Sequence, residues 1–302
     1  MEKELIIEAR NLKQYFRIND RYTVRAVDGV SFGIHAGEVF GLVGETGCGK
    51  STIARTLAGI YKPTEGTVLF EGVPVTGVNA SGEQRRKMQR EIQMVFQDSA
   101  AALNPRMTVE KIVMEPLRIQ KLIRDRETSR QALLAMLRCV GLDGTYLGKY
   151  PGELSGGQRQ RVAIARSLML NPKLILADEP VASMDISIQA QIVTLFQRLQ
   201  RERGFAMLFI AHDLSVIRFI SDTVGVMLRG KFVELAPAAE LFENPLHPYT
   251  RSLLSAIHVP DPVYERNKVV IDYDRKAPLG DKLIECTPGH FVLEHCPCSP
   301  PQ

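Results

Sequence analysis

The sequence predicts an α/β fold with a parallel β-sheet core, and two features carry this prediction. Residues Gly44–Ser51 have the form G-x-x-x-x-G-K-[ST] of a phosphate-binding P-loop, and they follow an apolar run at 39–43. Leu174–Ala177 is a continuous apolar run, typical of a parallel strand that is covered on both faces. Helical spacing over 188–199 and another apolar run at 206–210 continue the strand–helix–strand alternation, which implies right-handed crossovers.

A small antiparallel sheet is predicted around the start of the chain. Turn signals at Asn19-Asp20 and Ala36-Gly37 separate segments with the apolar alternation of strands. These strand-like segments are 5–7, 24–30, 31–34 and, after the P-loop, 67–70. We expect them to form a subdomain of their own beside the parallel core.

The rest of the chain is predicted to contain a helical insert and a C-terminal extension. Charged and apolar residues mix at helical spacing over 81–150, for example at Leu133 and Leu137, and a further helix is predicted over 158–170. From Pro260 onward, prolines interrupt the chain and the apolar periodicity fades. We therefore place a boundary near residue 258.

Composition limits the functional class only loosely. The 302 residues are 45% hydrophobic and 24% charged, which is ordinary for a globular protein, and the net charge of +4 is too small to indicate nucleic-acid binding. Apolar runs are strand-sized and no signal-peptide pattern follows Met1, so we expect a cytosolic protein or one that a partner docks on a membrane. Five cysteines, an odd number, favour a reducing compartment.

The P-loop predicts nucleotide binding. Its glycines let backbone N–H groups turn toward an anion, and the helix predicted at 52–60 adds its positive dipole end. Lys50 can reach the β- and γ-phosphates and the Ser51 hydroxyl can bind Mg²⁺. A glycine-rich turn before a helix is the alternative. The residues expected to bind the nucleotide are Gly44, Glu45, Thr46, Gly47, Cys48, Gly49, Lys50, Ser51 and Thr52.

Asp178 and Glu179 end the apolar strand at 174–177, where phosphoryl-transfer proteins hold Mg²⁺. Asp178 is expected to support the metal, and Glu179 to polarise the attacking water as a general base. The alternative is that these residues only terminate a strand.

Leu154–Gln158 precede a predicted helix and suggest a second anion site. Ser155 can cap the helix, and Gly156 and Gly157 expose backbone N–H groups at its positive end. An ordinary capped helix is the alternative for this motif taken alone.

The stretch Pro151–Arg161, which reads PGELSGGQRQR, resembles the signature motif of ATP-binding cassette (ABC) ATPases. Gln97 resembles the Q-loop glutamine of that family, His212 the switch histidine and Asp185 the D-loop aspartate. Tyr15 is placed like the aromatic residue that stacks on adenine, with Phe16 as the runner-up.

The resemblance covers roughly residues 4–258 and implies a specific architecture. It implies an ABC-type P-loop ATPase at 1–258, with a parallel-sheet core, a small antiparallel β subdomain and a helical subdomain at about 98–165, followed by the extension 259–302. Lys50, Gln97, Glu179 and His212 are the implied catalytic residues. Ser51, Gln97 and Asp178 are the implied Mg²⁺ ligands.

In that family two cassettes close head to tail around ATP. The signature motif and D-loop residues of one chain then complete the site of the other. On this chain these residues are Ser155, Gly156, Gly157, Gln158 and Asp185.

Three further stretches resemble importer ATPases for dipeptides and oligopeptides. They are 103–109, 185–191 and 243–251, and the same branch includes importers of nickel chelates and glutathione-like peptides. The chain resembles the second of two non-identical cassettes. The implied partners are a second, paralogous ATPase subunit, two polytopic membrane permease subunits and an extracytoplasmic peptide-binding protein. No nucleic acid is implied. The implied location is peripheral, at the cytoplasmic face of the cell membrane.

The chain departs from the family pattern at three places. The D-loop usually reads Ser-Ala-Leu-Asp, whereas residues 182–185 are Ala-Ser-Met-Asp, and the usual aromatic residue after Gln97 is missing from 98–102. These departures bear on coupling rather than on ATPase chemistry. Relatives often carry spaced cysteines in the extension, but Cys286, Cys296 and Cys298 lack the number and spacing for an iron–sulfur cluster or zinc, which we do not expect here.

Three other classes fit less well. ABC ATPases of DNA repair and chromosome organisation carry long heptad coiled coils between the P-loop and the signature motif, and no heptads occur here. Translation-associated ABC proteins fuse two cassettes in one chain, whereas this chain has one P-loop. A P-loop kinase is disfavoured by the signature motif.

Overall fold

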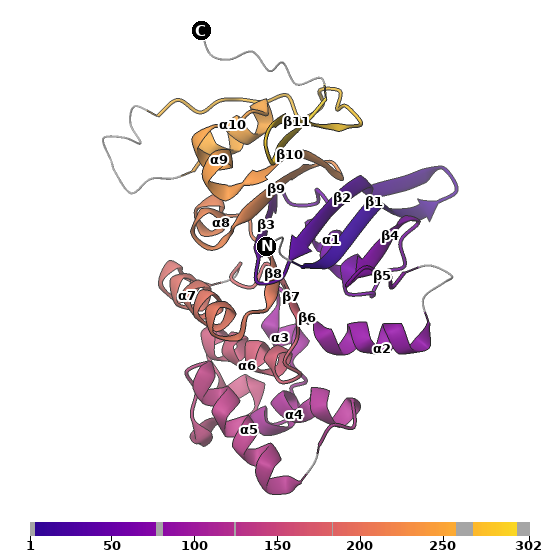
Figure 1. The fold of residues 1–302 in the computed structure, drawn as a ribbon. Helices are drawn as coiled ribbons and strands as arrows, with labels where there is room; N and C mark the ends of the chain where they lie inside the picture. Colours follow the sequence, from indigo (N-terminus) through magenta and orange to yellow (C-terminus); the bar gives the residue numbers. More distant parts are fainter. Residues whose placement is uncertain (1–3, 77–80, 124, 183, 258–267, 295–302) are drawn as a thin grey trace.

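The computed structural model describes residues 4–76, 81–123, 125–182, 184–257 and 268–294. The two β-sheets lie in the upper part of the view in Figure 1, and the helices α4, α5 and α6 lie below them. Among the described residues, no helix is both long and apolar enough to span a bilayer.

The larger sheet has eight strands in the order β11-β12-β10-β9-β3-β8-β7-β6. From β9 to β6 neighbouring strands run parallel, whereas β10, β12 and β11 are added antiparallel. Every residue of β3, β7 and β8 is buried, which confirms the predicted parallel core. The strands are β3 (Val39–Gly44), β6 (Ile92–Val95), β7 (Leu174–Asp178), β8 (Ala206–Ile210), β9 (Thr223–Leu228), β10 (Lys231–Pro237), β11 (Leu283–Thr287) and β12 (His290–Leu293).

The smaller sheet is antiparallel, as predicted, with the order β2-β1-β4-β5. Its strands are β1 (Leu5–Asn19), β2 (Tyr22–His35), β4 (Glu65–Phe70) and β5 (Val73–Pro74). The two strands expected at 24–30 and 31–34 are one strand. Gly29, at φ 79°, is skipped between the pairs Leu12–Val30 and Lys13–Asp28, so a β-bulge shifts the alternation without ending the strand.

Helices cover the large sheet and form the lower part of the molecule (Figure 1). The α-helices are α1 (Lys50–Leu57), α2 (Gly82–Glu91), α3 (Ser99–Ala102), α4 (Val109–Ile119), α5 (Arg126–Cys139), α6 (Gly156–Leu168), α7 (Ile186–Arg203), α8 (Leu214–Ile220), α9 (Ala238–Glu243) and α10 (Pro248–Ser255). Single 3₁₀ turns lie at Gly144–Tyr146 and Pro151–Glu153. Ile112, Leu137 and Val162 of α4, α5 and α6 are fully buried in a core shared with the sheet.

The segment 81–150 is not wholly helical, so that prediction was incomplete. β6 interrupts it and pairs in parallel with β7 at the edge of the large sheet. The strand has four residues, and Gln93 and Met94 at its centre are only half-buried. A strand this short at a sheet edge leaves too little apolar pattern to be recognised in the sequence.

The extension returns to the large sheet. β12 pairs with β10 through Glu234–Val292 and Leu235–Phe291, and β11 completes a hairpin with β12. Val292 and Leu293 are buried. No sequence pattern indicated this hairpin, because β11 is almost entirely exposed and carries no apolar alternation.

Candidate functional site

The P-loop connects β3 to α1, as the sequence predicts, and its glycines are required by close backbone contacts. Gly44 has φ 150° and Gly49 has φ 114°. A Cβ atom on Gly44 would lie 2.3 Å from the carbonyl oxygen of Met227, and one on Gly49 would lie 2.1 Å from that of Ala26. Any side chain at either position would force the loop away from the sheet.

Lys50 is the first residue of α1, and its side chain is buried against the P-loop. Its Nζ donates hydrogen bonds to the carbonyl oxygens of Gly44, at 2.6 Å, and Glu45, at 3.0 Å. The ammonium group therefore lies across the loop on backbone acceptors and has to exchange them for phosphate oxygens when a nucleotide enters. Burial raises the pKa of the neighbouring Cys48 thiol, although the charge of Lys50 opposes this. Cys48 is thus a protonated packing residue.

Asp178 ends β7 directly beside the start of α1. Its Oδ1 accepts a hydrogen bond from Ser51 Oγ at 2.7 Å. Its Oδ2 is buried without a hydrogen-bond partner, and the Arg55 guanidinium stands 3.9 Å away. Burial raises the pKa of Asp178, against the hydrogen bond from Ser51. A buried carboxylate oxygen without a hydrogen bond, beside a serine hydroxyl, suits a hard cation such as Mg²⁺.

Three residues predicted from separate motifs, Gln97, Glu179 and His212, meet at the Glu179 carboxylate. Its Oε2 accepts a hydrogen bond from Gln97 Nε2 at 2.8 Å and contacts His212 Nε2 at 2.6 Å. Gln97, Glu179 and His212 follow β6, β7 and β8, which are adjacent parallel strands, so their carboxyl ends meet at one edge of the sheet. Glu179 is almost fully buried and has φ 48°, a left-handed conformation that is rare outside glycine.

The signature motif caps α6, as predicted. Ser155 Oγ accepts the N–H of Gln158 at 3.3 Å, and Gln158 Oε1 accepts the N–H of Ser155 at 2.9 Å, which is a complete capping box. Gln158 also donates to the Tyr146 hydroxyl at 3.1 Å. Within the described part of the chain, no hydrogen bond joins this helix start to residues 44–52.

Asp185 and Tyr15 lie apart from the Glu179 cluster. Asp185 caps α7 by accepting the N–H of Ile188 at 3.0 Å, and this hydrogen bond lowers the pKa of Asp185. Tyr15 is half-buried on β1 and donates a hydrogen bond to Asp28. Burial and this hydrogen bond raise the pKa of Tyr15 to about 12. The Arg25 guanidinium lies over its ring at 5.5 Å.

Two residues that the sequence analysis did not assign also contact the P-loop. The Tyr249 hydroxyl accepts the backbone N–H of Glu45 at 3.3 Å, and Arg275 Nε lies 3.0 Å from Glu45 Oε1. Tyr249 belongs to the stretch 243–251, whose resemblance to importer ATPases was noted without a role for any residue. For Arg275 the sequence offered no signal.

The chain combines a P-loop after β3, an acidic residue pair at the end of β7 and a capped helix start with the signature motif. This combination is typical of ATP-binding cassette ATPases. Residues 27–182 match the family described as ABC transporter, and residues 233–277 match the family described as oligopeptide/dipeptide transporter, C-terminal region. The chain therefore belongs to the ABC transporter family, in its oligopeptide/dipeptide branch.

Similar proteins agree over nearly the whole length. The oligopeptide transport ATP-binding protein OppF of Bacillus subtilis is 52% identical over 295 residues, with 96% of each chain covered. The protein of that name in Escherichia coli is 44% identical, with 99% of this chain and 91% of that protein covered. Among solved structures, the dimeric post-hydrolysis state of the ATP-binding cassette MJ0796, bound to ADP and Pi, superimposes with a TM-score of 0.69 at 28% identity, covering 77% of this chain and 99% of that one.

Proposed function

We propose that this chain is the subunit that hydrolyses ATP to drive import of dipeptides or oligopeptides. The observation that carries the ATPase chemistry is the convergence of Gln97 and His212 on Glu179, next to the Ser51–Asp178 pair. Peptide import is supported by the relatives, which are described as oligopeptide or dipeptide transport ATP-binding proteins and are 44% to 52% identical.

The P-loop binds the phosphates in this proposal. Backbone N–H groups of 44–52 surround them, and Lys50 Nζ leaves the carbonyls of Gly44 and Glu45 to reach the β- and γ-phosphates. Ser51, Gln97 and Asp178 hold Mg²⁺ through oxygen atoms. When bound, Mg²⁺ neutralises charge that develops on the transferred phosphoryl group. Among the described residues, no group of three His, Cys, Asp or Glu side chains is arranged to hold a metal ion.

Glu179 is the general base. The carboxylate is buried and held by Gln97 and His212, so it can accept a proton from an attacking water without having to reorganise. His212, which lies beside Glu179, contacts the γ-phosphate in this proposal. Gln97 connects the base and the metal to the helical subdomain.

The signature motif and D-loop residues act across two chains. Ser155, Gly156, Gly157 and Gln158 face the nucleotide of a second cassette, and Asp185 lines the same interface. Tyr15 stacks on adenine after its ring is freed from Arg25.

The partners are a paralogous ATPase subunit, two membrane permease subunits and an extracytoplasmic peptide-binding protein. This chain is peripheral, at the cytoplasmic face of the membrane.

Glu179→Gln tests the assignment of the base. The amide keeps the shape of the side chain but cannot accept the proton, so the variant is expected to bind ATP, to lose at least about 100-fold in turnover, and to accumulate as an ATP-bound dimer. Phosphate release and size-exclusion chromatography with ATP measure this. Glu202→Gln, an exposed carboxylate near the end of α7, is the matched control. Wild-type turnover in Glu179→Gln would remove Glu179 from this role.

A further inference from the structure

Glu45 of the P-loop is held on three sides. Its carbonyl oxygen accepts a hydrogen bond from Lys50 Nζ, its N–H donates to the Tyr249 hydroxyl, and its carboxylate pairs with Arg275. Tyr249 and Arg275 lie after β10 in the sequence, within the segment that matches the C-terminal region of oligopeptide/dipeptide transporters. The C-terminal segment thus contacts one of the two loop residues whose carbonyl oxygens accept hydrogen bonds from Lys50.

Tyr249 is rigidly placed for this contact. It is 1% exposed, at the start of α10, and its N–H donates to His247 Nδ1 at 3.1 Å. The ring of Tyr273 packs against it with the ring centroids 5.5 Å apart. Burial and the nearby Glu45 carboxylate raise the pKa of Tyr249, so its hydroxyl stays neutral and available as an acceptor.

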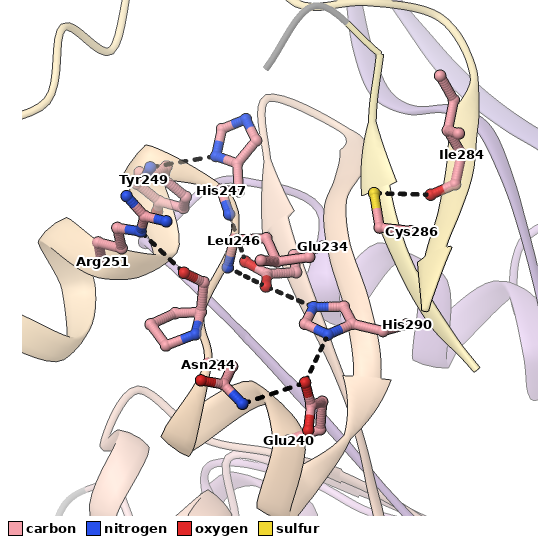
Figure 2. A network of polar contacts seen from close by, with 11 residues as sticks. Glu234, Glu240, Asn244, Leu246, His247, Tyr249, Arg251, Ile284, Cys286 and His290 are labelled. Carbon is pink, nitrogen blue, oxygen red and sulfur yellow. Dashed lines mark hydrogen bonds and ion pairs between the residues drawn. The ribbon is translucent and has the colours of Figure 1, made fainter. Parts of the chain in front are cut away.

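The turn that carries Tyr249 is fixed in turn by the C-terminal hairpin (Figure 2). The Glu234 carboxylate of β10 is fully buried and accepts the N–H groups of Leu246, at 2.7 Å, and His247, at 3.0 Å. The same carboxylate contacts Nε2 of His290 at 2.7 Å, and His290 is fully buried on β12. Charge-assisted hydrogen bonds of this kind, away from water, hold their groups firmly. One polar network therefore runs from the hairpin through the turn to the P-loop.

We propose that residues 246–257 and 268–293 position the P-loop for nucleotide, with Tyr249 and Arg275 as positioning residues that act through Glu45. The inference rests on the proposed assignment of Gly44–Ser51 as the ATP phosphate site. A loop that is already anchored loses less conformational freedom when ATP binds, so the anchors raise affinity for ATP. They touch none of the reacting atoms and leave the chemical step unchanged.

Two substitutions test the anchors separately in the full-length chain. Tyr249→Phe removes only the hydroxyl and is expected to weaken ATP binding about two- to tenfold, the effect of one lost neutral hydrogen bond. Arg275→Gln is expected to weaken it about 1.5- to 5-fold, as for an exposed ion pair, and Arg275→Lys should restore part of the loss. Lys276→Gln removes the same charge from the next residue and is the matched control. Fluorescent ATP titration gives the affinity, and kcat at saturating ATP should stay within about twofold of wild type.

A double-mutant cycle shows whether Arg275 acts through Glu45. Arg275→Gln should have no further effect in a Glu45→Gln background, because its partner is already gone. An equal effect in both backgrounds would overturn the proposal. Wild-type affinity for ATP in both Tyr249→Phe and Arg275→Gln would also overturn it. This holds even if Tyr249→Phe unfolds at a lower temperature, because a purely structural role would change stability and not ATP binding.

The same titrations distinguish a failure of the positioning role from a failure of the P-loop assignment. If Lys50→Ala binds ATP as tightly as wild type, the P-loop assignment itself fails. If Lys50→Ala loses affinity while the Tyr249 and Arg275 variants keep it, only the positioning role fails.

Discussion

Glu179, the proposed general base, has a left-handed backbone conformation. A left-handed backbone outside glycine costs on the order of 1 to 3 kcal/mol and persists only where neighbours enforce it. Here the N–H of Glu179 donates to the carbonyl oxygen of Ile210, and Gln97 and His212 hold the carboxylate. The strain is thus stored at the group we assign as the base.

His247 makes the C-terminal turn sensitive to acid. Burial lowers the pKa of His247 from 6.5 to about 4, so the folded chain keeps it neutral. The groups facing it are the Glu234 carboxylate, the N–H of Tyr249 and the ring of Tyr273. Because the unfolded chain binds this proton more readily, the free energy of unfolding falls as pH drops from about 6.5 to about 4.

His247→Asn tests this dependence. Asparagine can still cap α10 but does not titrate, so the variant should lose less stability than wild type between those pH values, by up to about 3 kcal/mol. Urea unfolding at pH 7 and at pH 4.5 measures the difference. Equal pH slopes for both proteins would contradict the assignment.

At the scale of elements, the core of the helical subdomain depends on α4, α5 and α6 packing together. Leu137 of α5 is fully buried there, whereas Ile119 of α4 is 69% exposed. Leu137→Ala should lower the free energy of unfolding by about 2 to 5 kcal/mol, because it leaves a cavity. Ile119→Ala, the control, should change it by less than about 0.5 kcal/mol. Chemical denaturation followed by circular dichroism distinguishes the two, and similar losses for both would contradict this packing.

The elements also show what the sequence could and could not predict. Buried strands such as β7 and β8 were recognisable because each is a continuous apolar run bounded by turn residues. The bulge at Gly29 split β2 in the prediction, and β6 and the hairpin β11–β12 are short and partly exposed. These elements depend on pairing with strands distant in the chain, which no local pattern records.

The same limit applies to the site. Lys50, Asp178, Glu179, Gln97 and His212 lie in local motifs, and the structure brings them to one edge of the sheet. Tyr249 reaches Glu45 across 204 residues of sequence. Contacts of that kind follow from the fold and carry no spacing of their own.

For the whole molecule, the proposed function makes this chain half of an ATP site. In the proposed arrangement the start of α6 meets the nucleotide of another cassette, and the similar cassette MJ0796 was solved as a dimer bound to ADP and Pi. An ATP-bound dimer should therefore need Ser155 on one chain and Lys50 on the other.

Ser155→Arg tests the composite site. In the double variant with Glu179→Gln, it should abolish the ATP-dependent dimer, because a bulky cation stands where the capped helix start approaches phosphate. The affinity of the single chain for ATP should stay within about threefold of that of the Glu179→Gln variant. Light scattering and ATP titration measure the two effects. Ser129→Arg, at the start of α5, is the control substitution. A stable dimer in the Ser155→Arg variant would contradict the arrangement.

The C-terminal hairpin also covers the edge of the large sheet that β10 would otherwise form. β10 has β9 on one side and β12 on the other, and the short, mostly exposed β11 becomes the last strand. A chain cut at residue 258, the boundary suggested by the sequence, would leave one side of β10 with unpaired N–H and C=O groups. Such an edge is a template for joining other chains. We therefore expect the excised 1–258 segment to associate with itself more readily than the whole protein.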